Sequence, residues 1–192
     1  MNKFAFTIAL AAGLHVIANA QVIDFEDLNN NGSSYTLYGD HFTSDGFLFT
    51  DLGHPGDSQA FASWTAGLPQ YYTGSVAPFL NYNNDLLTMT KVGGGTFSVS
   101  QIALADVFLH SNNSSVTFTD NNSNSETVTM TDGTHLLNYA LNFNNITSLT
   151  WNSGSIESTQ FDNIHVSAAP EPASMTLVGL GVLGLLRKRR RA

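Results

Sequence analysis

Val116-Thr117-Phe118-Thr119 and Thr127-Val128-Thr129-Met130-Thr131 lie on either side of the polar stretch 120–125. Apolar residues alternate with threonine in both runs, and this period of two predicts β-strands with one buried face and one wet face. Threonine is β-branched and suits an extended backbone. Asn and Ser in the intervening stretch favour a turn, so the segment predicts a hairpin.

The same alternation recurs along the chain and extends the prediction to the whole middle of the sequence. Further runs of this kind occupy residues 22–26, 46–50, 86–90, 96–100, 148–151 and 161–166. Asn- and Gly-rich turns separate them. Many short strands at such spacing are typical of a sandwich or barrel. We therefore expect an all-β protein with a single, jelly-roll-like β-sandwich over residues 21–167. Residues 51–84 are expected to form a long loop that is functional or partly disordered.

The N-terminus has the three regions of a secretory signal peptide. Lys3 gives a positive start, residues 4–17 are largely apolar, and Ala18-Asn19-Ala20 supplies small residues where a signal peptidase cleaves. We expect a signal-peptide helix over residues 1–20, removed by signal peptidase after Ala20.

The C-terminus has a second three-part signal. Pro170-Glu171-Pro172 interrupts regular structure, and an apolar run of 12 residues follows from Met175 to Leu186. This run is shorter than the ~20 residues of a standard membrane span, so it predicts a short transmembrane helix. A basic cluster then stops transfer on the cytoplasmic side: Arg187, Lys188, Arg189, Arg190 and Arg191.

This order of motif, apolar run and basic cluster resembles the PEP-CTERM sorting signal of exported bacterial proteins, here over residues 168–192. The resemblance implies recognition by an exosortase-type membrane protease and a link to exopolysaccharide-producing bacteria. It also implies transient anchoring by the C-terminal helix, followed by release to the cell envelope or the exterior.

Charge and cysteine content exclude several kinds of function. Without the two terminal signals, Lys91 is the only Lys or Arg against 14 acidic residues, a formal charge of −13. Such a surface repels nucleic acid and anionic lipid, so no nucleic-acid partner is expected. The chain has no cysteine, which excludes disulfides, thiolate nucleophiles and thiolate metal sites.

The first and last strands suggest a calcium site. Residues 23–26 and 161–166 resemble the framing strands of jelly-roll carbohydrate-binding modules. That resemblance implies a structural Ca²⁺ shared by Glu26 or Asp27 with Asp162, through the oxygen ligands that Ca²⁺ prefers. The alternative is that Asp162 only accepts hydrogen bonds from nearby backbone. Another calcium pattern, at residues 120–131, lacks the glycine and glutamate of an EF-hand loop, so a hairpin turn is favoured there.

Aromatic residues in the long loop suggest a glycan site. Trp64, Tyr71 and Tyr72 lie among prolines and glycines, where exposed rings could stack on sugars. The alternative is that the loop folds back and buries them as a satellite cluster. Trp151 is expected in the core, and the histidines are expected at the surface.

These features predict an exported, non-enzymatic protein associated with the envelope or extracellular matrix, with extracellular polysaccharide as a partner. A carbohydrate-binding module is the first alternative. A polysaccharide hydrolase is the second, and it requires two carboxylates that meet in a cleft.

Overall fold

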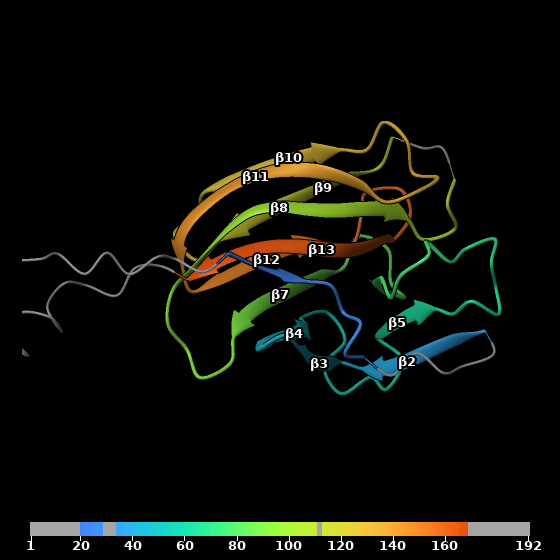
Figure 1. Cartoon of the computed structure of the whole chain (residues 1–192), viewed down its shortest axis with the longest axis horizontal. Helices are drawn as coiled ribbons and strands as arrows, with labels where there is room; N and C mark the ends of the chain where they lie inside the picture. Colours follow the sequence, from blue (N-terminus) through green and yellow to red (C-terminus); the bar gives the residue numbers. More distant parts are fainter. Residues whose placement is uncertain (1–19, 29–33, 111–112, 169–192) are drawn as a thin grey trace, which may run out of the picture. The chain divides into compact units, whose positions relative to one another are not determined.

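A computed structural model describes residues 20–28, 34–110 and 113–168. All regular structure in these residues is β, in 13 strands (Figure 1). The all-β sandwich expected from the sequence is thus confirmed. In this part of the chain no helix is long and apolar enough to cross a membrane. The predicted signal-peptide helix, Pro170-Glu171-Pro172, the C-terminal helix and the basic cluster lie outside the described residues.

The first sheet has four antiparallel strands and contains both ends of the described fold. In spatial order they are β1 (Ala20–Ile23), β13 (Thr159–Ala168), β8 (Phe97–Asp106) and β11 (Leu137–Ile146). Ala20 pairs with Ser167. The point where the chain enters the sandwich is therefore next to the point where it leaves.

The second sheet has six antiparallel strands and includes the predicted hairpin. In order they are β10 (Ser125–Thr129), β9 (Ser115–Asp120), β12 (Ser148–Asn152), β7 (Leu86–Lys91), β4 (Phe47–Asp51) and β3 (His41–Ser44). Val116 and Phe118 of β9 are buried. On the other face the hydroxyls of Thr117 and Thr127 meet at 3.0 Å. The alternation thus has the predicted buried and wet sides.

A third, small sheet corrects the expectation of a continuous loop over residues 51–84. It consists of β2 (Tyr35–Gly39), β5 (Phe61–Trp64) and β6 (Pro78–Leu80). β5 and β6 are short and buried almost throughout, so they show no alternation of apolar and polar residues. Pro78 lies in β6, an edge strand, where a missing N–H is tolerated.

Aromatic rings fill the space between the two large sheets. Trp151 of β12 is 1% exposed and meets Phe161 of β13 at right angles, with ring centroids 5.4 Å apart. The prediction that Trp151 is in the core is confirmed. Phe25 follows β1 and contacts Phe49 and Phe161 at centroid distances of 5.2 and 5.5 Å. Its φ of 58° lies outside the extended region, and β1 ends three residues earlier than the alternation over residues 22–26 predicts.

Candidate functional site

A groove of about 300 Å³ opens beside the third sheet. Its lining combines aromatic rings with two side-chain amides: Tyr35, Gln59, Trp64, Phe79, Asn81 and Tyr82. β2, β5 and β6 supply Tyr35, Trp64 and Phe79, and the other three residues flank β5 and β6. The short strands that the sequence analysis missed are therefore the ones that build this groove.

Trp64 is the central ring of the groove and is firmly held. Its Nε1 donates a hydrogen bond to the Val107 carbonyl at 2.6 Å. Its ring lies 5.3 Å from Phe79 and 6.2 Å from Tyr35, centroid to centroid. Trp64 is half-buried, whereas Tyr35 is 49% exposed. Trp64 thus packs against a satellite cluster and also lines the groove, and its stacking on sugars stays a prediction.

The structure separates the other two predicted aromatics. Tyr71 lies behind Trp64, with ring centroids 5.0 Å apart, and 5.5 Å from Phe108. Tyr72 belongs to another environment: burial raises its pKa, and the charges of Glu26 and Asp162 raise it further. The sequence analysis missed Tyr35, although the alternating Tyr35–Tyr38 segment could have indicated a strand with an exposed tyrosine.

Glu26 and Asp162, the predicted calcium ligands, hold the same segment of chain. The Glu26 carboxylate accepts a hydrogen bond from the backbone N–H of Val76 at 2.9 Å. The Asp162 carboxylate accepts one from the Ser75 hydroxyl at 2.6 Å. Asp27 lies apart from them, where its carboxylate accepts from the Ser44 hydroxyl at 2.5 Å. The structure therefore brings two of the three predicted ligands to one segment, and calcium there stays a prediction.

Both faces of β13 are covered at Asp162. Strand neighbours point to opposite faces, yet Phe161 and Asp162 are both buried: Phe161 packs in the aromatic core, and the segment of Ser75 covers Asp162. The pairing of β13 with β8 shifts register directly after Asp162, where Asn163 has a φ of 46°. Burial raises the pKa of Asp162 to about 6, and the charges of Glu26 and Asp24 add to this, against lowering by hydrogen bonds from Ser75 and Asn163.

Two histidines that the sequence placed at the surface each meet two acids. His54 lies with Asp51 and Asp85, and His110 lies with Asp106 and Glu157. The imidazoles are exposed as expected, at 42% and 61%. One acid of each cluster is near in sequence, at three residues for Asp51 and four for Asp106. The other could not be read from the sequence, because Asp85 is 31 residues from His54 and Glu157 is 47 from His110.

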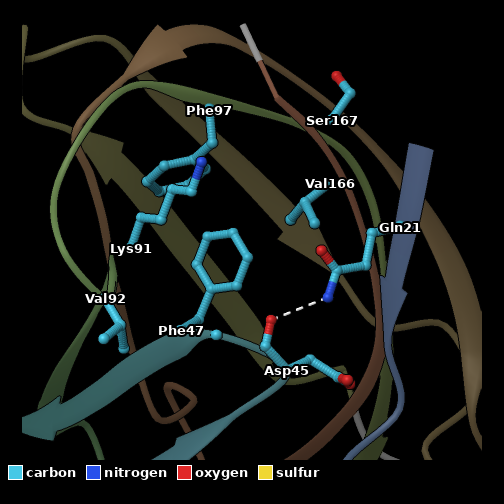
Figure 2. Close-up of a pocket in the computed structure, with 9 residues that line it drawn as sticks. Gln21, Asp45, Phe47, Lys91, Val92, Phe97, Val166 and Ser167 are labelled. Carbon is cyan, nitrogen blue, oxygen red and sulfur yellow. Dashed lines mark hydrogen bonds between the residues drawn. The ribbon is translucent and has the colours of Figure 1, made fainter. Parts of the chain in front are cut away.

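A second cavity, of about 390 Å³, lies at the end of the sandwich where the chain enters and leaves. Figure 2 shows Phe47, Phe97 and Val166 around it, with Gln21 reaching Asp45. The Gln21 amide donates to the Asp45 carbonyl at 2.8 Å. Lys91, the one Lys or Arg among the described residues, also lines this cavity. The positive charge of Lys91 therefore lies at this end of the sandwich.

Residues 168–191 match the PEP-CTERM protein-sorting motif. The resemblance found in the sequence is thereby confirmed for the C-terminus. The motif implies that the protein is exported, anchored transiently at its C-terminus and processed by an exosortase, a membrane protease.

Among curated proteins, no sequence is similar enough to count as a match. Solved structures with a similar chain path include the exo-β-1,3-galactanase of Phanerochaete chrysosporium, at 19% identity and a TM-score of 0.38. The match covers 78% of this chain and 30% of the galactanase. A Podospora anserina β-(1,4)-mannanase matches at 14% identity and 0.39, over 81% of this chain and 29% of the enzyme.

The cleaved adhesin domain K3 of Lys-gingipain from Porphyromonas gingivalis is also similar in chain path. It matches at 11% identity and a TM-score of 0.41, over 78% of this chain and 98% of the domain. The present chain thus spans about a third of the galactanase and mannanase chains.

Proposed function

We propose that this is a non-enzymatic protein of the cell envelope or extracellular matrix that binds polysaccharide in the groove of Tyr35 and Trp64. The single observation that carries the proposal is the composition of that groove: exposed aromatic surface beside the amide side chains of Gln59 and Asn81. Apolar walls with a few polar groups are typical of binding sites for small ligands.

The chemistry of the groove suits a sugar chain. The aliphatic faces of pyranose rings can lie against Tyr35 and Trp64, and each such contact contributes on the order of 1 kcal/mol. The amides of Gln59 and Asn81 both donate and accept hydrogen bonds, as sugar hydroxyls do. Binding by one copy is then weak, and many copies on one matrix compensate through avidity.

The position of the groove also supports this role. β1 begins and β13 ends on the left of Figure 1, whereas β2 and β5 lie on the right. The sorting tail follows β13 directly. The groove beside β2 and β5 therefore lies at a distance from the strand end that the tail follows.

The non-enzymatic part of the proposal rests on the carboxylates. None of the six residues that line the groove is acidic. In the Asp51–Asp85 and Asp106–Glu157 pairs, one carboxylate of each is fully buried, where a substrate does not reach it. A glycosidase requires both carboxylates at the glycosidic bond.

Retention on immobilised polysaccharides tests the proposal, with the purified full chain in mild detergent and a glycan array to choose the polysaccharide. Tyr35→Ala removes an exposed ring and should abolish retention with little change in melting temperature. Trp64→Ala should also abolish it, at some cost in stability. Leu37→Ala is the matched control, because Leu37 is an exposed apolar residue of the same strand and lies outside the groove lining.

Retention of Tyr35→Ala equal to that of the unaltered chain contradicts the proposal. So does an equal loss in Leu37→Ala, because that result assigns retention to general surface hydrophobicity. Release of reducing ends from the retained polysaccharide contradicts the non-enzymatic part alone.

A further inference from the structure

We propose that Asp51, His54 and Asp85 form a binding site for a divalent first-row transition-metal ion of the Zn²⁺ kind. The three residues are none of those that line the groove, although His54 stacks on the groove residue Tyr82. They are also distinct from the predicted calcium ligands, and the proposal does not depend on glycan binding.

The ligand atoms already lie together. One atom from each of the three residues lies within 4.8 Å of the other two. His54 Nδ1 is 2.5 Å from an Asp85 carboxylate oxygen and 3.8 Å from Asp51 Oδ2. Ligands of a tetrahedral ion with bonds near 2.0 Å are about 3.3 Å apart, so small side-chain movements suffice to form the site.

The observation that points to a ligand is the state of Asp51 Oδ2. This oxygen is buried and has no hydrogen-bond partner among the described residues. The other oxygen of the same carboxylate accepts a hydrogen bond from the Gly53 N–H at 3.0 Å. An unpartnered oxygen of a buried carboxylate is costly. A cation between Asp51, His54 and Asp85 supplies the missing partner.

Among the described residues, no Lys or Arg takes that place. Lys91, the one such residue in the described chain, lines the cavity of Figure 2. Apart from His54 itself, no basic side chain of the described residues lies at this cluster, so a cation bound there has to come from solution.

The chain around the cluster is shaped for this arrangement. A Cβ on Gly53 would lie 1.9 Å from the Asp85 carboxylate, so only glycine leaves room for Asp85 to approach. The His54 ring stacks on Tyr82 with centroids 3.6 Å apart, which fixes the imidazole plane. Asp51 ends β4 and Asp85 precedes β7, so both carboxylates are held by sheet structure.

The second histidine cluster, Asp106, His110 and Glu157, differs in how its buried carboxylate is hydrogen-bonded, so it provides the control for metal binding. The buried Asp106 carboxylate accepts hydrogen bonds from the N–H groups of Phe108 and His110, at 2.9 and 3.2 Å. It is therefore satisfied by its own turn. His110 is exposed and close to two acids, as His54 is, but the buried Asp106 carboxylate is not among the described groups that lack a hydrogen-bond partner.

The donor set indicates the class of ion. One imidazole and two carboxylates suit Zn²⁺ and its first-row neighbours, because imidazole favours these ions, whereas Ca²⁺ and Mg²⁺ prefer all-oxygen sites. Zn²⁺ should therefore bind in the presence of a large excess of Ca²⁺.

Equilibrium dialysis with Zn²⁺ tests the proposal, with the full chain purified in mild detergent without a histidine tag. We expect one tight ion per chain, retained in an excess of Ca²⁺. His54→Gln and Gly53→Ala should each weaken it by at least about tenfold, and His110→Gln should leave it unchanged within twofold. Zn²⁺ at a hundredfold excess over Kd should raise the melting temperature by about 5 °C or more, but not in His54→Gln.

Co²⁺ provides a second reading, because its visible absorption reports direct ligation by imidazole and carboxylate. The unaltered chain and His110→Gln should give the band, and His54→Gln should not. Absence of binding at millimolar Zn²⁺ overturns the proposal. Unchanged affinity in His54→Gln overturns it too, as does an equal loss in His110→Gln.

Discussion

Asp162 has a buried carboxyl with two hydrogen-bond donors and two other acids around it. Its carboxylate accepts hydrogen bonds from Ser75 and from the backbone of Asn163, but burial and the charges of Glu26 and Asp24 outweigh them and raise its pKa to about 6. The folded protein therefore keeps a proton on Asp162 at pH values where the unfolded chain, with an ordinary pKa of 3.8, has released it.

This difference predicts how stability changes with pH when metal ions are removed. The native state binds more protons between the two pKa values, so the contribution of Asp162 is fully present below pH 3.8 and is lost as the pH rises through about 6. The full interval corresponds to about 3 kcal/mol of unfolding free energy. Asp162→Asn keeps the shape without the charge, so in EDTA it should be more stable than the unaltered chain at pH 7.5 and equal to it at pH 4.

Denaturant unfolding at a series of pH values measures this. A stability difference between the two proteins that does not vary with pH contradicts the predicted pH dependence.

Millimolar Ca²⁺ tests the predicted calcium ligation in the same experiment. Bound Ca²⁺ holds Glu26 and Asp162 charged and should raise the melting temperature of the unaltered chain but not of Asp162→Asn. Melting curves that are the same in Ca²⁺ and EDTA remove the calcium hypothesis.

At the level of single residues, the sequence could indicate kinds of site but not which residues share them. Glu26 and Asp162 were paired through the resemblance of their strands, and the structure brings them to Ser75 and Val76. Nothing in the sequence pattern indicated Asp51 or Asp85 as site residues. Their significance depends on burial and on the approach to His54, and neither is visible in a one-dimensional pattern.

At the scale of elements, the β9–β10 hairpin depends on one side chain in its turn. One oxygen of the Asp120 carboxylate accepts hydrogen bonds from the backbone N–H groups of Asn122 and Asn124, at 2.8 and 2.9 Å. The other accepts from the Asn124 amide at 2.8 Å. Burial acts to raise the pKa of Asp120, but the hydrogen bonds from Asn124 and Asn122 lower it overall. The residues that resemble part of an EF-hand loop therefore form a turn closed by Asp120.

We predict that Asp120→Ala destabilises the protein by about 2 kcal/mol, because it removes three hydrogen bonds and leaves two turn N–H groups without that acceptor. Asn122→Ala is the control: Asn122 contributes mainly its backbone to this turn, so the change should be small. Urea unfolding at neutral pH measures both. Equal effects of the two substitutions would mean that the Asp120 carboxylate does not support the turn.

The strands that the sequence predicted are those with clear alternation, and the missed strands lack it for physical reasons. β9, β10, β7 and β12 alternate apolar residues with threonine or serine. β5 and β6 are short and buried at every position except Trp64. β11 has Asn at positions 138, 142 and 144, which favours a turn, and its pairing with β8 shifts register twice. The groove remained hidden because these short strands build it.

At the scale of the whole molecule, export and folding are served by different parts of the chain. β1 begins at Ala20 and β13 ends at Ala168, and the sorting motif starts at residue 168. The described strands thus use almost none of the motif. Loss of the tail should therefore leave the stability of the sandwich unchanged but should alter where the protein is delivered.

Deletion of residues 170–192 tests this division. We expect a melting temperature within about 2 °C of the unaltered chain, because a change of 1 kcal/mol moves the midpoint of a domain of this size by 2–4 °C. The truncated protein should be exported but released in soluble form or misrouted, because it lacks the apolar run and the processing motif.

Substitution of Pro170 and Pro172 by alanine is the matched control: it keeps the length, the apolar run and the charge of the tail and removes only the motif. That variant should stay in the membrane with Arg191 and Ala192 still attached, as mass spectrometry of the C-terminal peptide can show. The unaltered mature protein should lack them. A mature form that still ends at Ala192 would mean that the tail is a permanent anchor and that no exosortase cuts it.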